Sequence, residues 1–144
     1  MIKHRDNKIM ETLDRMAADV APIRSARIAA AVCIGKDIIS FGTNQSKTHT
    51  FQQRFRKKPE ACYWHAETNA IYNALKRVHI DDLNRATLYI SRMKYDGSEA
   101  RNAKLIRGLA KPCAGCQSCI DWVGIKRVCY TTDEGGLELL GFSR

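Results

Sequence analysis

The stretch His65-Ala66-Glu67-Thr68-Asn69-Ala70-Ile71 and, further along, Pro112-Cys113-Ala114-Gly115-Cys116 are the most informative parts of this chain. The first places a histidine and a glutamate at the start of an expected helix, and the second places two cysteines, separated by two residues, at the start of another. Histidine and cysteine are ligands that zinc prefers in proteins. The two motifs therefore predict that His65, Cys113 and Cys116 hold one zinc ion.

Three protein ligands leave a fourth position on zinc for a water molecule, and such an open position separates catalytic from structural zinc sites. Glu67 follows His65 by two residues, and in the first turn of a helix its carboxylate can reach over that water. A carboxylate in this place can transfer protons. The combination H-x-E with P-C-x-x-C is a known signature of zinc-dependent nucleobase deaminases.

The chain resembles the zinc-dependent cytidine and deoxycytidylate deaminase superfamily, and most closely the dCMP deaminases. Besides the two motifs, the resemblance rests on strand-like segments around the second motif and on an asparagine after a first hairpin, namely Ala86–Ile90, Gly124–Tyr130 and Asn44. It covers residues 25–131 in the expected order. It implies a three-layer α/β/α fold with a mixed sheet of about five strands flanked by helices.

The resemblance also implies an activity, the hydrolytic deamination of dCMP to dUMP with release of ammonia, which serves pyrimidine nucleotide metabolism and the supply of dTMP. Zinc activates the attacking water, and Glu67 carries protons to N3 of the ring and to the departing amine. The backbone N–H of Ala66 holds the ring carbonyl, and Asn44 contacts the sugar. The other expected substrate contacts are Thr43, Arg27 and Trp64, and the candidate phosphate partners are Arg24, Lys47 and Arg54.

Hydrophobic periodicity outlines the remaining elements. It predicts a helix over 6–20, a strand hairpin over 28–42, a helix over 65–78, a strand over 86–91, a helix over 112–123, a strand over 126–131 and a helical turn or edge strand at 137–140. Basic segments lie at 43–63 and 92–111, and the second is expected to contain a short helix near 103–109. This order predicts a layered α/β domain whose last three strand–helix crossings are parallel and right-handed.

The 144 residues fit one deaminase domain, with an N-terminal helix at 1–24, a core at 25–131 and a C-terminal tail at 132–144. With 44% hydrophobic and 27% charged residues, the composition excludes wholesale disorder. No apolar run approaches the roughly 20 residues that cross a bilayer. Residues 1–6 lack the apolar stretch of a secretory signal. We therefore expect no membrane partner and a cytoplasmic location (host cytoplasm if the protein is viral).

The net charge of +9 keeps a nucleic-acid substrate open, because polyanion binding draws on many Lys and Arg side chains. The alternatives are a deaminase that acts on a base in nucleic acid (tRNA adenosine or single-stranded polynucleotide cytidine), a free-nucleoside deaminase, and a non-catalytic zinc-binding nucleic-acid module. Aromatic residues for stacking unpaired bases are scattered, which favours dCMP. The segment 92–111 is expected to cap the pocket or to form a subunit contact, and the resemblance implies a homo-oligomer, a dimer or hexamer.

The remaining cysteines bear on whether the zinc site is open. A closed structural site needs a fourth ligand, for which Cys62 and Cys119 are the candidates. Glu67 argues against a closed site, since such a site has no use for its carboxylate. Cys33 and Cys129 lie in expected strands, where burial as small apolar residues is the default.

Overall fold

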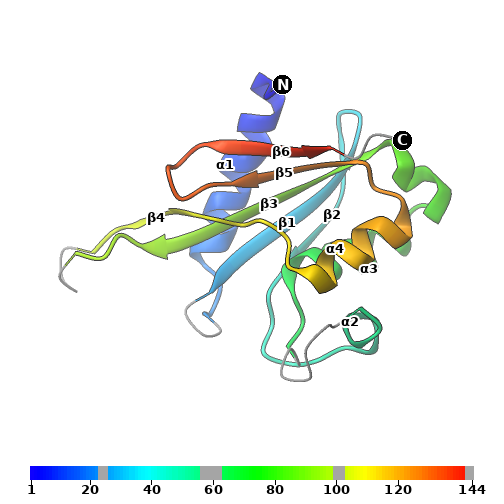
Figure 1. Ribbon diagram of the computed structural model, residues 1–144, viewed down its shortest axis with the longest axis horizontal. Coiled ribbons are helices and arrows are strands. Elements are labelled where there is room, and N and C mark those ends of the chain that lie inside the picture. Colours follow the sequence, from blue (N-terminus) through cyan, green and yellow to red (C-terminus); the bar gives the residue numbers. More distant parts are fainter. Residues whose placement is uncertain (23–25, 56–62, 99–102, 142–144) are drawn as a thin grey trace.

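The computed structural model describes residues 1–22, 26–55, 63–98 and 103–141. A six-stranded mixed sheet forms its centre, with α1 (His4–Ala18) on one face and α3 (Ala66–Leu75) and α4 (Ala114–Val123) on the other (Figure 1). The strands lie in the order β2 (Asp37–Thr43), β1 (Arg27–Ile34), β3 (Ala86–Tyr95), β5 (Arg127–Thr131) and β6 (Leu137–Gly141), and β4 (Leu105–Gly108) pairs with β3. The expected three-layer α/β/α fold is confirmed. Two short helical elements are α2 (Thr50–Gln53) and the 3-10 helix η1 (Ile80–Arg85).

The strand pairing is parallel only between β3 and β5 within the described residues. The expected first hairpin is confirmed, because β1 and β2 pair antiparallel around Gly35, whose φ of +60° suits glycine. The last three crossings were expected to be parallel, and β3–α4–β5 does join parallel strands. The prediction is wrong for the final connection, because β5 and β6 pair antiparallel with no helix among the described residues between them. The last segment is an antiparallel edge strand, β6, rather than a helical turn.

The central strands are apolar on both faces because helices cover both sides of the sheet. In β1, Ala30 and Val32 belong to the core shared with α3 and α4, whereas Ala31 and Cys33 belong to the core shared with α1. Cys129 of β5 is also fully buried on the α1 side. The two strand cysteines are thus core residues, as expected. Among the described residues, no helix combines the length and the apolar composition needed to span a bilayer.

Helix α3 packs closely on the edge of the sheet at Gly42. An ideal Cβ at Gly42 would lie 2.3 Å from the backbone nitrogen of Ala70 and 2.6 Å from the carbonyl oxygen of Ala66. Ser40, on the same face of β2, donates a hydrogen bond of 2.7 Å to the Ala70 carbonyl. The backbone of α3 therefore rests directly on β2, and this contact sets the position of the start of the helix.

The segment 92–111 contains a strand where a short helix near 103–109 was expected, so that prediction is wrong. β3 continues beyond Ser91 to Tyr95, and β4 pairs with this extension from Arg92↔Gly108 to Tyr95↔Leu105. The two paired segments extend from the body of the sheet, and we call them the β3–β4 arm (Figure 1). The backbone groups that the end of β3 offers for pairing outweigh a weak local helix propensity.

Candidate active site

The beginnings of α3 and α4 meet and bring three potential metal ligands together. His65 and Cys113 each occupy the position just before a helix, and Cys116 lies in the first turn of α4. The Nδ1 atom of His65 lies 3.3 Å from the Sγ of Cys116 and 3.7 Å from the Sγ of Cys113. All three ligand atoms lie within 4.8 Å of one another. We call these three residues the metal-ligand group.

The donor set and its spacing fit zinc. With Zn–N near 2.05 Å and Zn–S near 2.3 Å in a tetrahedral site, the nitrogen-to-sulfur distance is about 3.6 Å. The two observed distances, 3.3 and 3.7 Å, lie on either side of this value. Within the described part of the chain the group contains three ligands, because Cys119 is buried in the apolar core instead. Cys62 lies outside the described residues.

The two cysteines differ in their protonation. The hydrogen bond from Cys116 lowers the pKa of the Cys113 thiol to about 3, against the effect of burial, and His65 adds to this. The same hydrogen bond and full burial raise the pKa of Cys116. For His65, burial lowers the pKa, but the hydrogen bond with Cys113 and the negative charges of Glu67 and Cys113 together outweigh burial, and the net shift is upward. Cys113 is thus held as a thiolate, the form that binds zinc.

Glu67 lies beside the metal-ligand group and is 5% exposed. Its Oε1 atom is buried and has no hydrogen-bond partner among the described residues. Burial raises the pKa of the carboxyl group, while the charge of His65 opposes the shift. An unpaired buried acceptor costs free energy unless a ligand pairs with it, so this oxygen marks a place where a ligand is expected to bind.

Gln52 of α2 holds the start of α3 in place. Its Oε1 atom accepts a hydrogen bond of 3.1 Å from the backbone N–H of His65 and a short one from the hydroxyl of Thr68. The Thr68 hydroxyl also lies 3.1 Å from the carbonyl oxygen of His65. Gln52 therefore satisfies a donor at the helix start from a neighbouring element. Sequence reasoning missed this residue, because it lies in the irregular segment 43–63 with no motif around it.

A pocket of about 260 Å³ opens beside the metal-ligand group. Its lining includes His65, Glu67 and Cys113, and is completed by Ala26, Ile28, Asn44, Tyr63, Arg92, Leu109, Ala110 and Lys111. The ring of Tyr63 stacks on the imidazole of His65, with centroids 4.7 Å apart. A larger cavity of about 570 Å³ lies between the end of α1 and residues 43–46. None of the metal ligands lines it, so the smaller pocket is the candidate active site.

Asn44, the expected sugar contact, lines the pocket, and its amide makes two hydrogen bonds to the backbone at the start of β1. Its Oδ1 accepts a hydrogen bond of 2.9 Å from the N–H of Ile28, and its Nδ2 donates one of 3.0 Å to the carbonyl of Ala26. Both partners line the pocket at the start of β1. Asn44 therefore fixes one wall of the pocket. Ala66 is buried as the first residue of α3.

The other expected substrate contacts lie away from the pocket. Thr43 lines the larger cavity. Trp64 is buried and stacks on the ring of His49, with centroids 4.2 Å apart. The guanidinium of Arg27 lies 4.9 Å from the ring centre of Tyr95, on the face of the sheet that α1 covers. None of these three lines the pocket in the structure.

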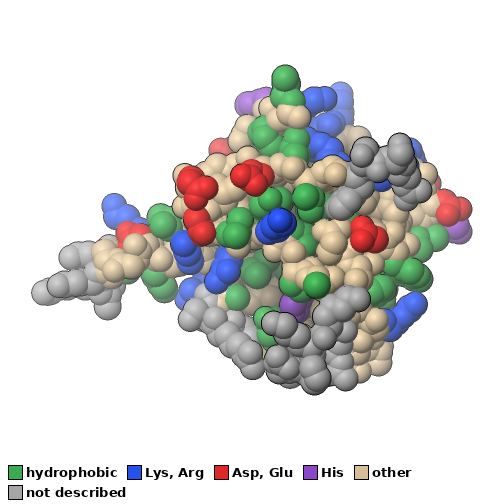
Figure 2. All heavy atoms as spheres, viewed as in Figure 1, with side chains coloured by type: hydrophobic (Ala, Val, Ile, Leu, Met, Phe, Trp, Pro, Cys, Tyr) green, Lys and Arg blue, Asp and Glu red, His purple; other side chains and the backbone are tan. Residues whose placement is uncertain are grey.

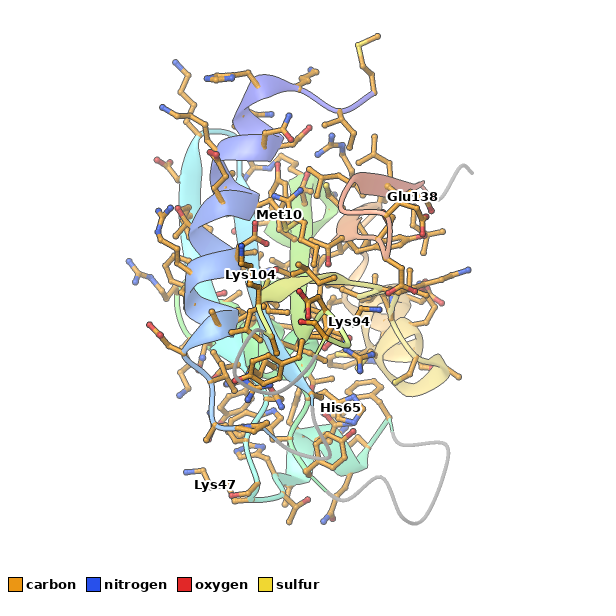
Figure 3. All side chains as sticks on the ribbon, turned by 90° about the vertical axis from the view of Figure 1, so that its left-hand side faces the viewer. Met10, Lys47, His65, Lys94, Lys104 and Glu138 are labelled. Atoms are coloured by element: carbon orange, nitrogen blue, oxygen red, sulfur yellow. The ribbon has the colours of Figure 1, made fainter. Side chains whose placement is uncertain are left out.

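The candidate phosphate partners also lie elsewhere. Lys47 is exposed and does not line the pocket, although its backbone carbonyl accepts a hydrogen bond of 3.0 Å from the N–H of Trp64, next to His65 (Figure 3). The guanidinium of Arg54 lies 4.8 Å from the ring centre of Trp122, and Arg24 lies outside the described residues.

Two other cations, Arg92 and Lys111, line the pocket instead. Both belong to the basic segment 92–111, which was expected to cap the pocket or to form a subunit contact. Figure 2 shows a hollow on this face, with Lys and Arg side chains beside it where the arm joins the body. The sequence identifies Lys111 among the cations of this segment, but it offers no signal that Arg92 lines the pocket, since the direction of the Arg92 side chain depends on strand register.

Comparison with known proteins places this site in a family. The chain matches the family model described as the cytidine and deoxycytidylate deaminase zinc-binding region over residues 3–132. It is similar to the crystal structure of dCMP deaminase from the cyanophage S-TIM5 in apo form, with 19% identity and a TM-score of 0.61, covering 92% of this chain and 86% of that chain. The same phage enzyme in complex with dCMP and dUMP gives 18% identity and a TM-score of 0.59, covering 92% and 84%.

At these identities the two structures show a shared fold. No sequence among the curated proteins matches the chain. The family model spans every helix and strand except β6, and it includes the metal-ligand group. The chain therefore belongs to the cytidine and deoxycytidylate deaminase family of zinc-binding proteins.

Proposed function

We propose that this protein catalyses the hydrolytic deamination of dCMP to dUMP, with release of ammonia. The observation that carries the proposal is the buried, unpaired Oε1 of Glu67 beside the metal-ligand group in one pocket. The family supports a zinc-dependent deaminase, and the complex of the similar phage enzyme with dCMP and dUMP supports this substrate. His65, Cys113 and Cys116 would hold the zinc ion, which when bound would supply an activated water.

Glu67 is the proposed proton carrier. Its carboxylate accepts a proton from the attacking water and delivers it to N3 of the ring. It then transfers the second proton of that water to the departing amine. Burial raises its pKa, which suits a group that must both accept and donate a proton. The backbone N–H of Ala66 is among the first of α3, which have no partner within the helix, and we assign it to the ring carbonyl. Asn44, fixed at the pocket wall, is the proposed sugar contact.

The experiment compares the zinc-loaded protein on dCMP, deoxycytidine and single-stranded DNA by ammonia release. We expect turnover of dCMP, and we expect Glu67→Gln to lose at least about 100-fold in kcat while it still binds one zinc. Glu11→Gln, an exposed position on α1, is the matched control. Activity on DNA but not on dCMP would contradict the substrate. Full activity of Glu67→Gln would contradict the mechanism, and zinc binding without any turnover would favour a non-catalytic module.

A homo-oligomer, a dimer or hexamer, and a place in cytoplasmic pyrimidine nucleotide metabolism stay predictions. Light scattering of the purified zinc-loaded protein tests the first, since a monomer would contradict it.

A further inference from the structure

The base of the β3–β4 arm brings two cations to the candidate active site. Arg92 is the first arm residue on β3, and Lys111 follows β4 on the way back to the zinc motif. Arg92 pairs in register with Ile28 of β1, which lines the same pocket. Both cations therefore share the pocket with Glu67.

The Arg92 side chain lies beside Gly108 of β4 and lines the pocket. Its partner on β4 is Gly108, where an ideal Cβ would lie 3.5 Å from the Cδ of Arg92 and 3.1 Å from the Cδ of Lys94. The glycine thus leaves room for the stem of Arg92 to lie over β4. The Nε of Arg92 is buried and has no hydrogen-bond partner in the described part of the structure. A buried cationic donor without a partner is costly unless an anion binds it.

The neighbouring cations of the arm are neutralised, in contrast to Arg92. Lys94 pairs with Asp133 at 2.8 Å, and Arg107 pairs with Asp14 of α1 at 2.8 Å. Asp133 also accepts a hydrogen bond from the Leu109 N–H, and Arg92 acts on it only through a weaker charge effect.

Within the described ranges, neither Arg92 nor Lys111 forms an ion pair. The positive charge at the pocket is therefore available to a ligand.

Thr131 of β5 holds the base of the arm rigid. Its hydroxyl accepts a hydrogen bond of 3.1 Å from the Arg92 N–H and donates one of 2.7 Å to the carbonyl of Gly108. Its own carbonyl accepts a hydrogen bond of 3.0 Å from the N–H of Ala110, next to Lys111. The backbone on both sides of the pair is thus fixed before a ligand arrives, which lowers the entropy cost of binding.

We propose that Arg92 and Lys111 form an anion subsite that binds the phosphate of a mononucleotide while its base lies at Glu67. This inference rests on the proposed function and adds the residues that make a nucleotide, rather than a nucleoside, the substrate. The planar guanidinium fork of Arg92 can bind two phosphate oxygens at once, and the Lys111 ammonium adds a point charge. A pocket of about 260 Å³ suits one nucleotide rather than several.

The test measures kcat/KM for dCMP and for deoxycytidine in zinc-loaded Arg92→Met and Lys111→Met. For Arg92→Met we expect the ratio of kcat/KM for dCMP to kcat/KM for deoxycytidine to fall by about 10- to 100-fold, because a charge-assisted hydrogen bond to the phosphate is lost. The loss should appear mainly as a higher KM for dCMP. The matched controls are two exposed cations, Arg77→Met, two residues after α3, and Lys104→Met, directly before β4 (Figure 3). An unchanged ratio, or an equal loss on both substrates, would overturn the subsite.

A binding measurement keeps this test separate from the proposed activity. Calorimetry with dUMP and with deoxyuridine needs no turnover, and we expect dUMP to bind the wild-type protein more tightly, with the difference reduced in Arg92→Met. Inorganic phosphate is expected to compete with dUMP. Equal binding of dUMP and deoxyuridine, or binding of single-stranded DNA without binding of dUMP, would overturn the inference. If neither substrate turns over while dUMP still shows this pattern, the proposed function fails and the anion subsite stands.

Discussion

Replacing Gly42 with alanine is expected to move helix α3 and to damage the active site from a distance. The added Cβ would lie 2.3 Å from the nitrogen of Ala70 and 2.6 Å from the carbonyl oxygen of Ala66. Both are backbone atoms of α3, so no side-chain rotation can relieve the contact. Ordinary van der Waals contact begins at 3.4 Å, so the helix and the strand must separate by about 1 Å.

The cost can be estimated from this overlap. Inserting a group into a well-packed core typically costs about 1–3 kcal/mol, and for a chain of this size a loss of about 2 kcal/mol lowers Tm by roughly 4–8 °C. The start of α3 carries Glu67 and follows His65 directly, so both move with the helix. A misplacement of about 1 Å at a catalytic group costs about 100-fold in rate.

Three measurements test this reasoning: Tm by calorimetry, zinc affinity by chelator competition and turnover of dCMP. All three are expected to fall for Gly42→Ala. Gly141→Ala on β6 is the matched control, because a Cβ there meets nothing within 4 Å. A Tm and a zinc affinity equal to those of the control would refute the packing argument. A lowered Tm with intact activity would refute the link between this contact and the site.

Two further predictions concern residues that hold the fold around the site. Gln52→Leu removes the acceptor used by the His65 N–H, so we expect a loss of about 1–3 kcal/mol in unfolding free energy and weaker zinc binding in a chelator titration. The control is Gln53→Leu, at an exposed position. Equal zinc affinity of the two variants would count against the role of Gln52. At Asp6, burial raises the pKa, but the hydrogen bonds from Arg127 and neighbouring groups outweigh it and hold the pKa well below its usual range. The ionised form therefore stabilises the fold above about pH 4, and this contribution is lost as the pH falls below that. In urea unfolding, the difference in unfolding free energy between wild type and Asp6→Asn should shrink between pH 7 and pH 3. An equal difference in unfolding free energy at the two pH values would contradict the prediction.

The metal-ligand group was predictable because its chemistry depends on residue type and local spacing. Cys113 and Cys116 stand one helical turn apart, so they face the same ion wherever the helix lies. The central strands were predictable for a similar reason. The apolar run in β1 is buried on both faces by the helices on either side of it, and such a run has few other stable places in a folded chain.

Gln52 and β4 could not be predicted in this way, because their roles depend on partners distant in the sequence. Gln52 acts on His65 across a loop, and nothing in its own neighbourhood distinguishes it from Gln53. Residues Leu105–Gly108 are a strand only because the extended end of β3 offers its backbone groups for pairing. A local reading of the same residues favoured a helix.

The zinc chemistry and the layered fold thus follow from the chain's own residue types and periodicity, but which cations reach the pocket was decided by the tertiary structure. Lys47 and Arg54 belong to a basic segment as prominent as the one that contains Arg92, yet neither lines the pocket. Arg92 does so because β3 pairs with β1 in the register that sets it opposite Ile28. Side chains alternate between the faces of a sheet, so a shift of one residue would turn Arg92 toward α1. Composition determines how many cationic side chains the chain carries, and strand register determines that the Arg92 side chain is one of those that line the pocket.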